Sequence, residues 1–300
     1  MTASNPPRDE SHPGPGRQYP GGAHLDTTAQ LMNRITSQLG RQLSLVSRNG
    51  ARRPAPPALV LVAHGSRDPR ALATVHALME RVRDLRPHLP LHLGHIELND
   101  PLLPGTLASL GEDRAVLVPL LLGRGHHVKR DIPEAAAAAR ADTIVAAPLG
   151  PHPLLVETLH DRLVEAGWRI RPGDVRHRAD AVVLAAAGSR DPDSALDTRR
   201  TARLLAERLG VPVLPAYASA AAPTVADAVR ALTARGRHRV ALASYFTAPG
   251  RFAAECTAAA PWIAAAPLGA HPAVARLVLQ RYDQAVTAGE PVAERALASA

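Results

Sequence analysis

The chain has a single cysteine, few aromatic residues and no long apolar run. Cys256 is the one cysteine in 300 residues, so an intrachain disulfide is excluded and a reducing compartment is favoured. No uninterrupted apolar stretch approaches the ~18 residues that a membrane span needs. The N-terminal sequence MTASNPPRDE lacks the basic and apolar regions of a secretory signal. We therefore expect a cytoplasmic protein with no membrane partner.

Basic residues outnumber acidic ones, and the formal net charge is +8. No run of lysine or arginine is interleaved with aromatic residues, which argues against a nucleic-acid partner. The excess of basic residues has two interpretations. Either the arginines are spread over solvated faces, or they attract a polyanion. Four cations beside or near His127 favour a carboxylate-rich small molecule for the second reading: Arg67, Arg124, Lys129 and Arg130.

The sequence contains one structural plan twice. Residues 59–69, LVLVAHGSRDP, recur as 182–192, VVLAAAGSRDP. Residues 146–153, AAPLGPHP, recur as 265–272, AAPLGAHP. Both repeats carry the glycine and proline typical of turns, which indicates that a supersecondary unit has been duplicated.

Strand-like and helix-like patterns alternate in each copy. Apolar, β-branched runs at 58–63, 91–98, 114–122 and 142–149 predict buried strands, and the segments between them have helical spacing. Strand–helix units in series predict a parallel sheet with right-handed crossovers and helices on both faces. We therefore expect an α/β fold of two tandem, doubly wound parallel-sheet lobes.

We divide the chain into an N-terminal extension and two lobes. The extension, residues 1–57, is rich in proline, glycine and polar residues and is expected to be largely disordered, with a candidate amphipathic helix at 28–47. The first lobe covers 58–170 and the second 180–290. The polar stretch at 169–179, which contains proline and glycine, separates them.

Three side chains of the kinds that bind metals are expected at one edge of the first sheet. His64 directly follows the first strand, Glu97 ends the second, and His127 lies in the loop after the third. Open parallel sheets bind ligands at the carboxyl ends of their strands. Two imidazoles and a carboxylate suit a first-row divalent metal. The second lobe has lost all three, because the matching residues are Ala187, Ser219 and Phe252.

Three neighbours of these residues have open roles. His126 adjoins His127, and His95 is expected to share a strand face with Glu97. Each is either a partner of a metal ligand or simply exposed. Asp131 lies four residues beyond His127 and is expected to cap or orient its loop.

Residues retained in both lobes are more simply explained by structural duties. Gly65 and Ser66 return as Gly188 and Ser189 and suit a tight strand-to-helix turn. The following Arg-Asp-Pro sequence also returns, which favours helix-start duty. His152 returns as His271, and both are expected to be structural for the same reason.

These motifs resemble the CbiX/SirB family of sirohydrochlorin chelatases. The resemblance is carried by AHGSRDP, the pairing of Glu97 with Pro101, VPLLLGRGHHVKRDIP and APLGPHP, and it covers residues 58–288. It implies a lyase that inserts Fe²⁺ or Co²⁺ into a tetrapyrrole for sirohaem or cobalamin biosynthesis. The metal is then a substrate, and no organic cofactor is expected. The resemblance assigns metal binding to His64 and His127, with Glu97 assisting.

The resemblance also implies a substrate rich in carboxylates, sirohydrochlorin. We expect Glu97 to ligate the metal, to accept pyrrole protons, or both. The residues expected to bind the substrate are Ser66, Arg67, Arg124, Lys129 and Arg130. The alternatives are a non-enzymatic metal or tetrapyrrole carrier and a non-haem iron enzyme. Iron is favoured over cobalt, although no residue of the sequence distinguishes the two metals. The oligomeric state stays open.

Overall fold

The computed structural model describes residues 32, 38, 55–169 and 178–289. The chain divides into one unit from Met1 to Ala55 and a second from Pro56 to Ala300, and the second contains both lobes. The expected disorder of the extension, the candidate helix at 28–47 and most of the polar stretch at 169–179 lie outside the described residues.

The first lobe is built on a parallel sheet of 4 strands in the order β2-β1-β3-β4. The strands are β1 (Ala58–Ala63), β2 (Leu91–His95), β3 (Ala115–Pro119) and β4 (Thr143–Val145). Ala63 pairs with His95, so β1 and β2 end together. The side chains that follow these strands therefore meet at one edge of the sheet, as predicted.

Helical segments follow each strand of the first lobe. They are α2 (Pro69–Leu85), α3 (Leu103–Ser109), the π-helical turn η1 (His127–Asp131), α4 (Ile132–Ala137) and α5 (Pro153–Glu165). The Asp68 carboxylate accepts a hydrogen bond from the Arg70 amide at 2.9 Å, and Pro69 occupies the first turn of α2. The predicted helix-start duty of this motif is therefore confirmed.

The second lobe repeats the plan with the strand order β6-β5-β7-β8. Its strands are β5 (Asp180–Ala186), β6 (Val213–Tyr217), β7 (Arg239–Tyr245) and β8 (Ile263–Ala264), and its helices are α6 (Pro192–Leu209), α7 (Val225–Thr233), α8 (Arg251–Ala258) and α9 (Pro272–Gly289). Asp191 caps α6 as Asp68 caps α2. The prediction of two parallel-sheet α/β lobes is confirmed.

The strands are shorter than the apolar runs that predicted them. β2 ends at His95, and the chain then turns, with Leu98 in the left-handed region at φ 68°. The prediction that His95 and Glu97 share a strand face is therefore wrong. The Glu97 amide instead donates to the His64 carbonyl at 3.0 Å, which joins the ends of both strands.

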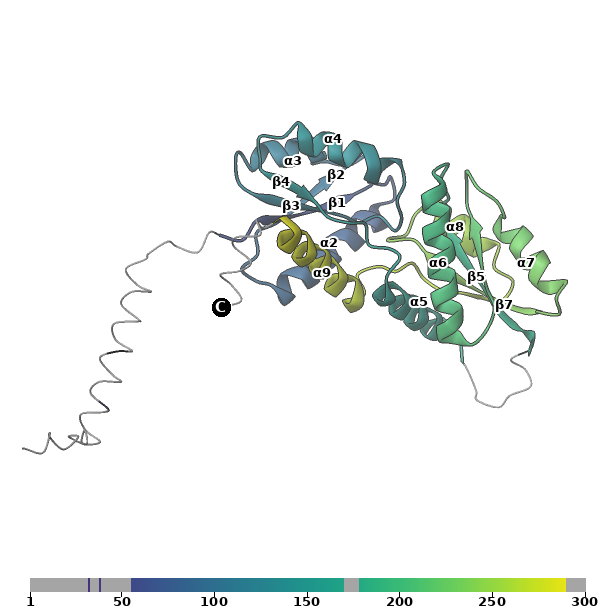
Figure 1. Ribbon diagram of the computed structural model, residues 1–300. Coiled ribbons are helices and arrows are strands. Elements are labelled where there is room, and N and C mark those ends of the chain that lie inside the picture. Colours follow the sequence, from purple (N-terminus) through teal and green to yellow (C-terminus); the bar gives the residue numbers. More distant parts are fainter. Residues whose placement is uncertain (1–31, 33–37, 39–54, 170–177, 290–300) are drawn as a thin grey trace, which may run out of the picture. The chain divides into compact units, whose positions relative to one another are not determined.

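The last helix of each lobe packs on the sheet of the other lobe. α5 contacts α6 and β7, whereas α9 contacts α2 and β3, as the yellow helix in Figure 1 shows. The contacts are reciprocal: Arg162 of α5 donates to the Leu268 carbonyl at 3.0 Å, and Arg281 of α9 donates to the Leu149 carbonyl at 3.2 Å. Buried residues of both lobes belong to one hydrophobic cluster. The two lobes are therefore consecutive in the sequence but share part of their hydrophobic core.

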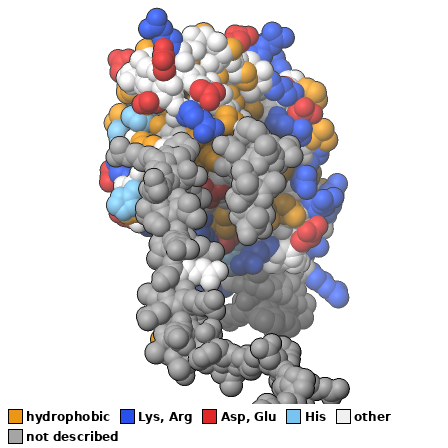
Figure 2. Space-filling model, turned by 60° about the vertical axis from the view of Figure 1, so that its left-hand side comes forward, with side chains coloured by type: hydrophobic (Ala, Val, Ile, Leu, Met, Phe, Trp, Pro, Cys, Tyr) orange, Lys and Arg blue, Asp and Glu red, His pale blue; other side chains and the backbone are white. Residues whose placement is uncertain are grey.

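Charged side chains are dispersed over the face shown in Figure 2, where lysine and arginine lie among acidic and uncharged residues. Several arginines form ion pairs, for example Arg162 with Glu165 within α5 at 2.6 Å and Arg276 of α9 with Glu157 of α5 at 2.7 Å. This pattern supports solvated ion pairs as the role of many arginines. Within the ranges that the structure describes, no helix combines the length and apolarity needed to cross a membrane.

Candidate metal centre

The structure brings the three predicted donors together. His64 lies directly after β1, and its ring centroid is 4.7 Å from that of His127, with the ring planes at 84°. Glu97 Oε1 lies 3.5 Å from His64 Nδ1. Two imidazoles and one carboxylate thus meet at the carboxyl edge of the first sheet, although they are far apart in the sequence.

This cluster is open rather than closed. The side chains of His64 and Glu97 are 44% and 52% exposed. Within residues 55–169 and 178–289, no group of three or more His, Cys, Asp or Glu residues is placed to hold a metal ion, so His64, Glu97 and His127 do not form a complete three-ligand site in this structure. A metal held mainly by two imidazoles keeps coordination positions open for an incoming ligand. Such an arrangement suits an ion that is handed on.

A carboxylate fixes the orientation of His127. Its Nδ1 lies 2.5 Å from Asp131 Oδ2, and donation to this carboxylate leaves Nε2 as the nitrogen with a free lone pair. The expectation that Asp131 orients the segment carrying His127 is therefore supported.

The segment carrying His127 is a π-helical turn, so the prediction that this residue lies in a loop is wrong. The Ile132 amide donates to the His127 carbonyl, which gives the wider turn. The matching segment of the second lobe, Arg251–Ala258, is an ordinary α-helix. Single π turns often occur at functional sites, where they place a side chain that a regular helix would direct elsewhere.

The two other histidines have different surroundings. His126 is 70% exposed and its Nε2 lies 3.5 Å from Asp131 Oδ1, so it contacts the group that orients His127. His95 is 1% exposed, which excludes the exposed reading for it. Its Nδ1 donates to the Pro101 carbonyl at 3.3 Å, and burial lowers the pKa of its ring.

The loops that carry His64 and Glu97 are braced against each other. Gly65 has φ +102°, and a Cβ there would lie 1.8 Å from the Glu97 carbonyl oxygen. Glycine is therefore required at this close approach. The Ser66 amide donates to Asn99 Oδ1 at 2.7 Å, which adds a second tie between the loops.

Asn99 was missed by sequence reasoning, although a signal was present. The second lobe makes the same close approach, because a Cβ on Gly188 would lie 1.8 Å from the Ser219 carbonyl oxygen. There, however, Ala221 replaces the asparagine. Asn99 is thus lost together with the three donors, while the turn itself is retained.

Substitution Asn99→Ala is expected to weaken Co²⁺ binding several-fold and to lower the free energy of unfolding by about 1 kcal/mol, as for one lost hydrogen bond. The fold should persist because Ala221 occupies the same turn in the second lobe. Thermal unfolding and Co²⁺ titration measure the two effects. Unchanged Co²⁺ affinity would assign Asn99 a purely structural role.

A cavity of about 450 Å³ adjoins the donors. His64 and His127 line it from the first lobe, and Ser189, Tyr245 and Phe252 line it from the second. Phe252 occupies the position that matches His127. At this matched position the first lobe therefore has an imidazole, and the second lobe has an aromatic ring that lines the cavity.

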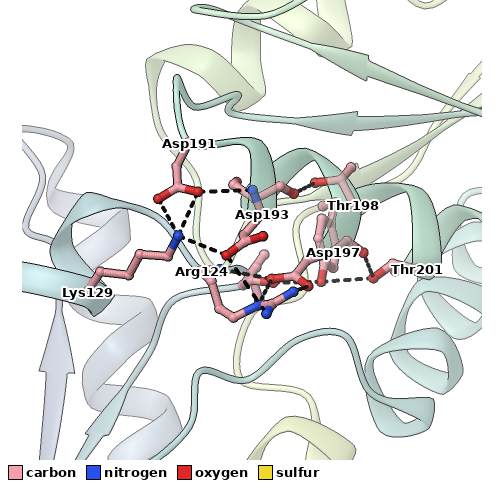
Figure 3. A network of polar contacts seen from close by, with 10 residues as sticks. Arg124, Lys129, Asp191, Asp193, Asp197, Thr198 and Thr201 are labelled. Atoms are coloured by element: carbon pink, nitrogen blue, oxygen red, sulfur yellow. Dashed lines mark hydrogen bonds and ion pairs between the residues drawn. The ribbon is translucent and has the colours of Figure 1, made fainter.

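Two of the cations predicted to bind substrate are paired with acids of the second lobe. Arg124 Nη2 donates to Asp197 Oδ1 at 2.8 Å, and Lys129 Nζ donates to Asp191 Oδ1 at 2.8 Å and to Asp193 Oδ2 at 2.9 Å (Figure 3). The two carboxylates raise the pKa of Lys129, and Lys129 lowers that of Asp191.

The other three residues predicted to bind substrate lie differently. Arg67 and Arg130 are exposed, and no acidic residue of the described chain pairs with either. Ser66 Oγ accepts a hydrogen bond from the Asp68 amide at 3.1 Å. Ser66 thus shapes the turn before α2, as its repetition in the second lobe predicted.

The chain belongs to the CbiX family, whose model matches residues 58–166 and 181–285. A sirohydrochlorin cobaltochelatase of Methanopyrus kandleri is 30% identical over 137 residues, which cover 36% of this chain and 96% of that protein. The sirohydrochlorin ferrochelatase of Bacillus subtilis is 29% identical over 178 residues, 55% of this chain and 64% of that protein. A cobaltochelatase of Methanococcus aeolicus is 35% identical over 80 residues, 26% of this chain and only 56% of that protein.

Solved structures share the two-lobe fold. SirB from Bacillus subtilis with Fe³⁺ has a TM-score of 0.63 at 23% identity, covering 77% of this chain and 95% of that chain. SirB from Bacillus subtilis subspecies spizizenii in complex with cobalt has a TM-score of 0.60 at 21% identity, with the same coverage. The family resemblance and the fold class predicted from the sequence are both confirmed.

Proposed function

We propose that this protein is a chelatase that inserts Fe²⁺ or Co²⁺ into sirohydrochlorin. The observation that carries the proposal is the contact between His64 and His127 beside a cavity, with Glu97 close to the first ring. Membership of a family whose relatives are named sirohydrochlorin chelatases supports this substrate class. The structures of SirB with Fe³⁺ and with cobalt support an iron or cobalt ion as the second substrate.

Each residue of the centre has a distinct role in this proposal. His64 and His127 hold the ion as neutral imidazoles, and Asp131 keeps the His127 Nε2 lone pair available. Insertion displaces two pyrrole N–H protons, which must be accepted by a base near the macrocycle. Glu97 is the carboxylate placed for this task, since it lies beside His64 and is half-exposed.

The four cations predicted to bind substrate differ in how readily they can bind a carboxylate, and none of them is among the residues that line the 450 Å³ cavity. Arg67 and Arg130 are exposed without an acidic partner in the described chain, so no existing ion pair has to break. Lys129 is 40% exposed and pairs with partly exposed acids, which a substrate carboxylate can replace. Arg124 is bound to Asp197, whose side chain is only 4% exposed, and is the least available of the four.

An anaerobic insertion assay tests the proposal. Fe²⁺ and Co²⁺ are offered separately to sirohydrochlorin with a catalytic amount of protein, and the visible spectrum of the tetrapyrrole is followed. We expect many turnovers per protein molecule with at least one of the metals. Binding that stops at one equivalent would identify a carrier, and turnover that requires oxygen would identify a non-haem iron enzyme.

A further inference from the structure

Residues of the second lobe hold the segment that leads to His127. The Tyr245 hydroxyl donates to the Leu122 carbonyl at 3.1 Å. The Arg124 amide donates to Asp197 Oδ2 at 3.0 Å, and the guanidinium of Arg124 donates to the same carboxylate through Nε at 3.1 Å and Nη2 at 2.8 Å. Two anchors thus lie within a few residues of the imidazole.

The two anchors are connected inside the second lobe. Thr201 Oγ1 lies 3.1 Å from the Asp197 carbonyl oxygen and 3.2 Å from the Tyr245 hydroxyl. Figure 3 shows the threonine hydroxyl directed back to the carboxylate-bearing turn of α6. Asp197 and Tyr245 are each 3% exposed, so the hydrogen bonds of both anchors are largely shielded from water.

The anchors are specific to this pairing of lobes. In the aligned helices α2 and α6, Asp197 matches Thr74, and in the aligned third strands Tyr245 matches Leu120. The loop residue matching Arg124 is Pro249. The second lobe therefore has the anchoring groups and the first lobe has the group that is anchored. A shared requirement of the fold would have placed the same groups in both lobes.

We propose that Asp197 and Tyr245 are positioning residues that hold His127 against His64. The inference rests on the proposed function, since it concerns the metal held by the two imidazoles. A loop fixed at Leu122 and Arg124 limits how far the π turn can move, and the affinity of a metal site depends on such supporting contacts. The second lobe, which has lost its own donors, then acts by fixing the geometry of the first.

Two variants test this without removing a metal donor. Tyr245→Phe deletes one hydroxyl and keeps the ring, and Asp197→Asn keeps the shape of the side chain and removes its charge. We expect each to weaken Co²⁺ binding by the metal-free protein about tenfold, as for other residues that support metal ligands. Co²⁺ absorption titration measures the affinity. In the insertion assay the weaker binding should appear as a higher KM for the metal.

The matched control is Asp283→Asn. Asp283 binds Arg86 through two contacts of 2.7 and 2.5 Å, which also join elements of different lobes, but at the C-terminal end of α2, away from the donor edge. It should leave Co²⁺ affinity unchanged even if it lowers the melting temperature. An equal loss of affinity in this control would overturn the inference, because general loosening would then explain the effect.

A third variant, His127→Ala, separates this inference from the proposed function. If it loses Co²⁺ binding while folded Tyr245→Phe binds as tightly as the wild type, the positioning role is refuted and the metal site stands. If His127→Ala itself binds Co²⁺ normally, the proposed metal site is wrong. Should Asp197→Asn fail to fold, Tyr245→Phe alone decides the question, since it leaves no buried charge unpaired.

Discussion

Replacing His127 with alanine is expected to reduce metal insertion into sirohydrochlorin by about a hundredfold or more, with the fold retained. The imidazole is one of two that contact each other at the cavity, and its side chain is partly exposed, so its loss removes a ligand without opening a core. His64→Ala should behave alike. The insertion assay measures the rate, and circular dichroism checks the fold.

His88 supplies a matched control, because it is an exposed histidine in the turn before β2, at the opposite edge of the sheet. His88→Ala should insert metal at the wild-type rate. Asp131→Asn should lie between the two, about 10- to 100-fold below the wild type, since it keeps both imidazoles but removes the group that orients one of them. A His127→Ala protein that is folded and fully active would exclude this residue from the mechanism.

The fold was predictable because its determinants are local and repeated. Apolar runs such as 58–63 specify buried strands, and the repeated Ser-Arg-Asp-Pro turns at Asp68–Pro69 and Asp191–Pro192 each begin a helix. The exchange of α5 and α9 between lobes was not predictable. Their apolar patterns show that each helix has a buried face, but two similar sheets offer that face equivalent partners.

The site was predictable only in part, for a related reason. His64, Glu97 and His127 follow strands that end at one edge, so topology alone brings them together. The partners of Arg124 do not follow from topology. Whether a guanidinium binds a substrate carboxylate or Asp197, 73 residues away in sequence, depends on how the two lobes meet.

Because α9 covers the first sheet, we expect a fragment of the first lobe without α9 to be much less stable than the full chain. A fragment of residues 55–169 contains the whole first sheet but lacks α9, and its own α5 must cover the face that α9 covers in the full chain. The repeats 146–153 and 265–272 align the two helices, so α5 would offer Thr158 where α9 buries Leu277, and His160 where α9 buries Leu279. Each such replacement costs about 1–3 kcal/mol.

The same alignment places Leu163 of α5 at the position of Tyr282, whose hydroxyl donates to the Pro57 carbonyl at 2.6 Å, and Val164 at that of Asp283, the partner of Arg86. Summed over these positions, the loss approaches the 5–15 kcal/mol that stabilises a whole domain. We therefore expect the 55–169 fragment to lack a cooperative thermal transition as a monomer, measured by circular dichroism and light scattering.

A hybrid chain provides the matched control. It joins residues 55–150 to 270–289, within the sequence PLG-x-HP that both lobes share, and so gives the first sheet the helix that covers it in the full protein. This hybrid should show the cooperative thermal transition that the 55–169 fragment is expected to lack. The two chains contain the same sheet and differ only in the helix that covers it. Equal stability would mean that the side chains of α9 fit the first sheet no better than those of α5. A more stable hybrid would show that those side chains are adapted to the sheet they cover, so that the first sheet depends on a helix from the other end of the chain.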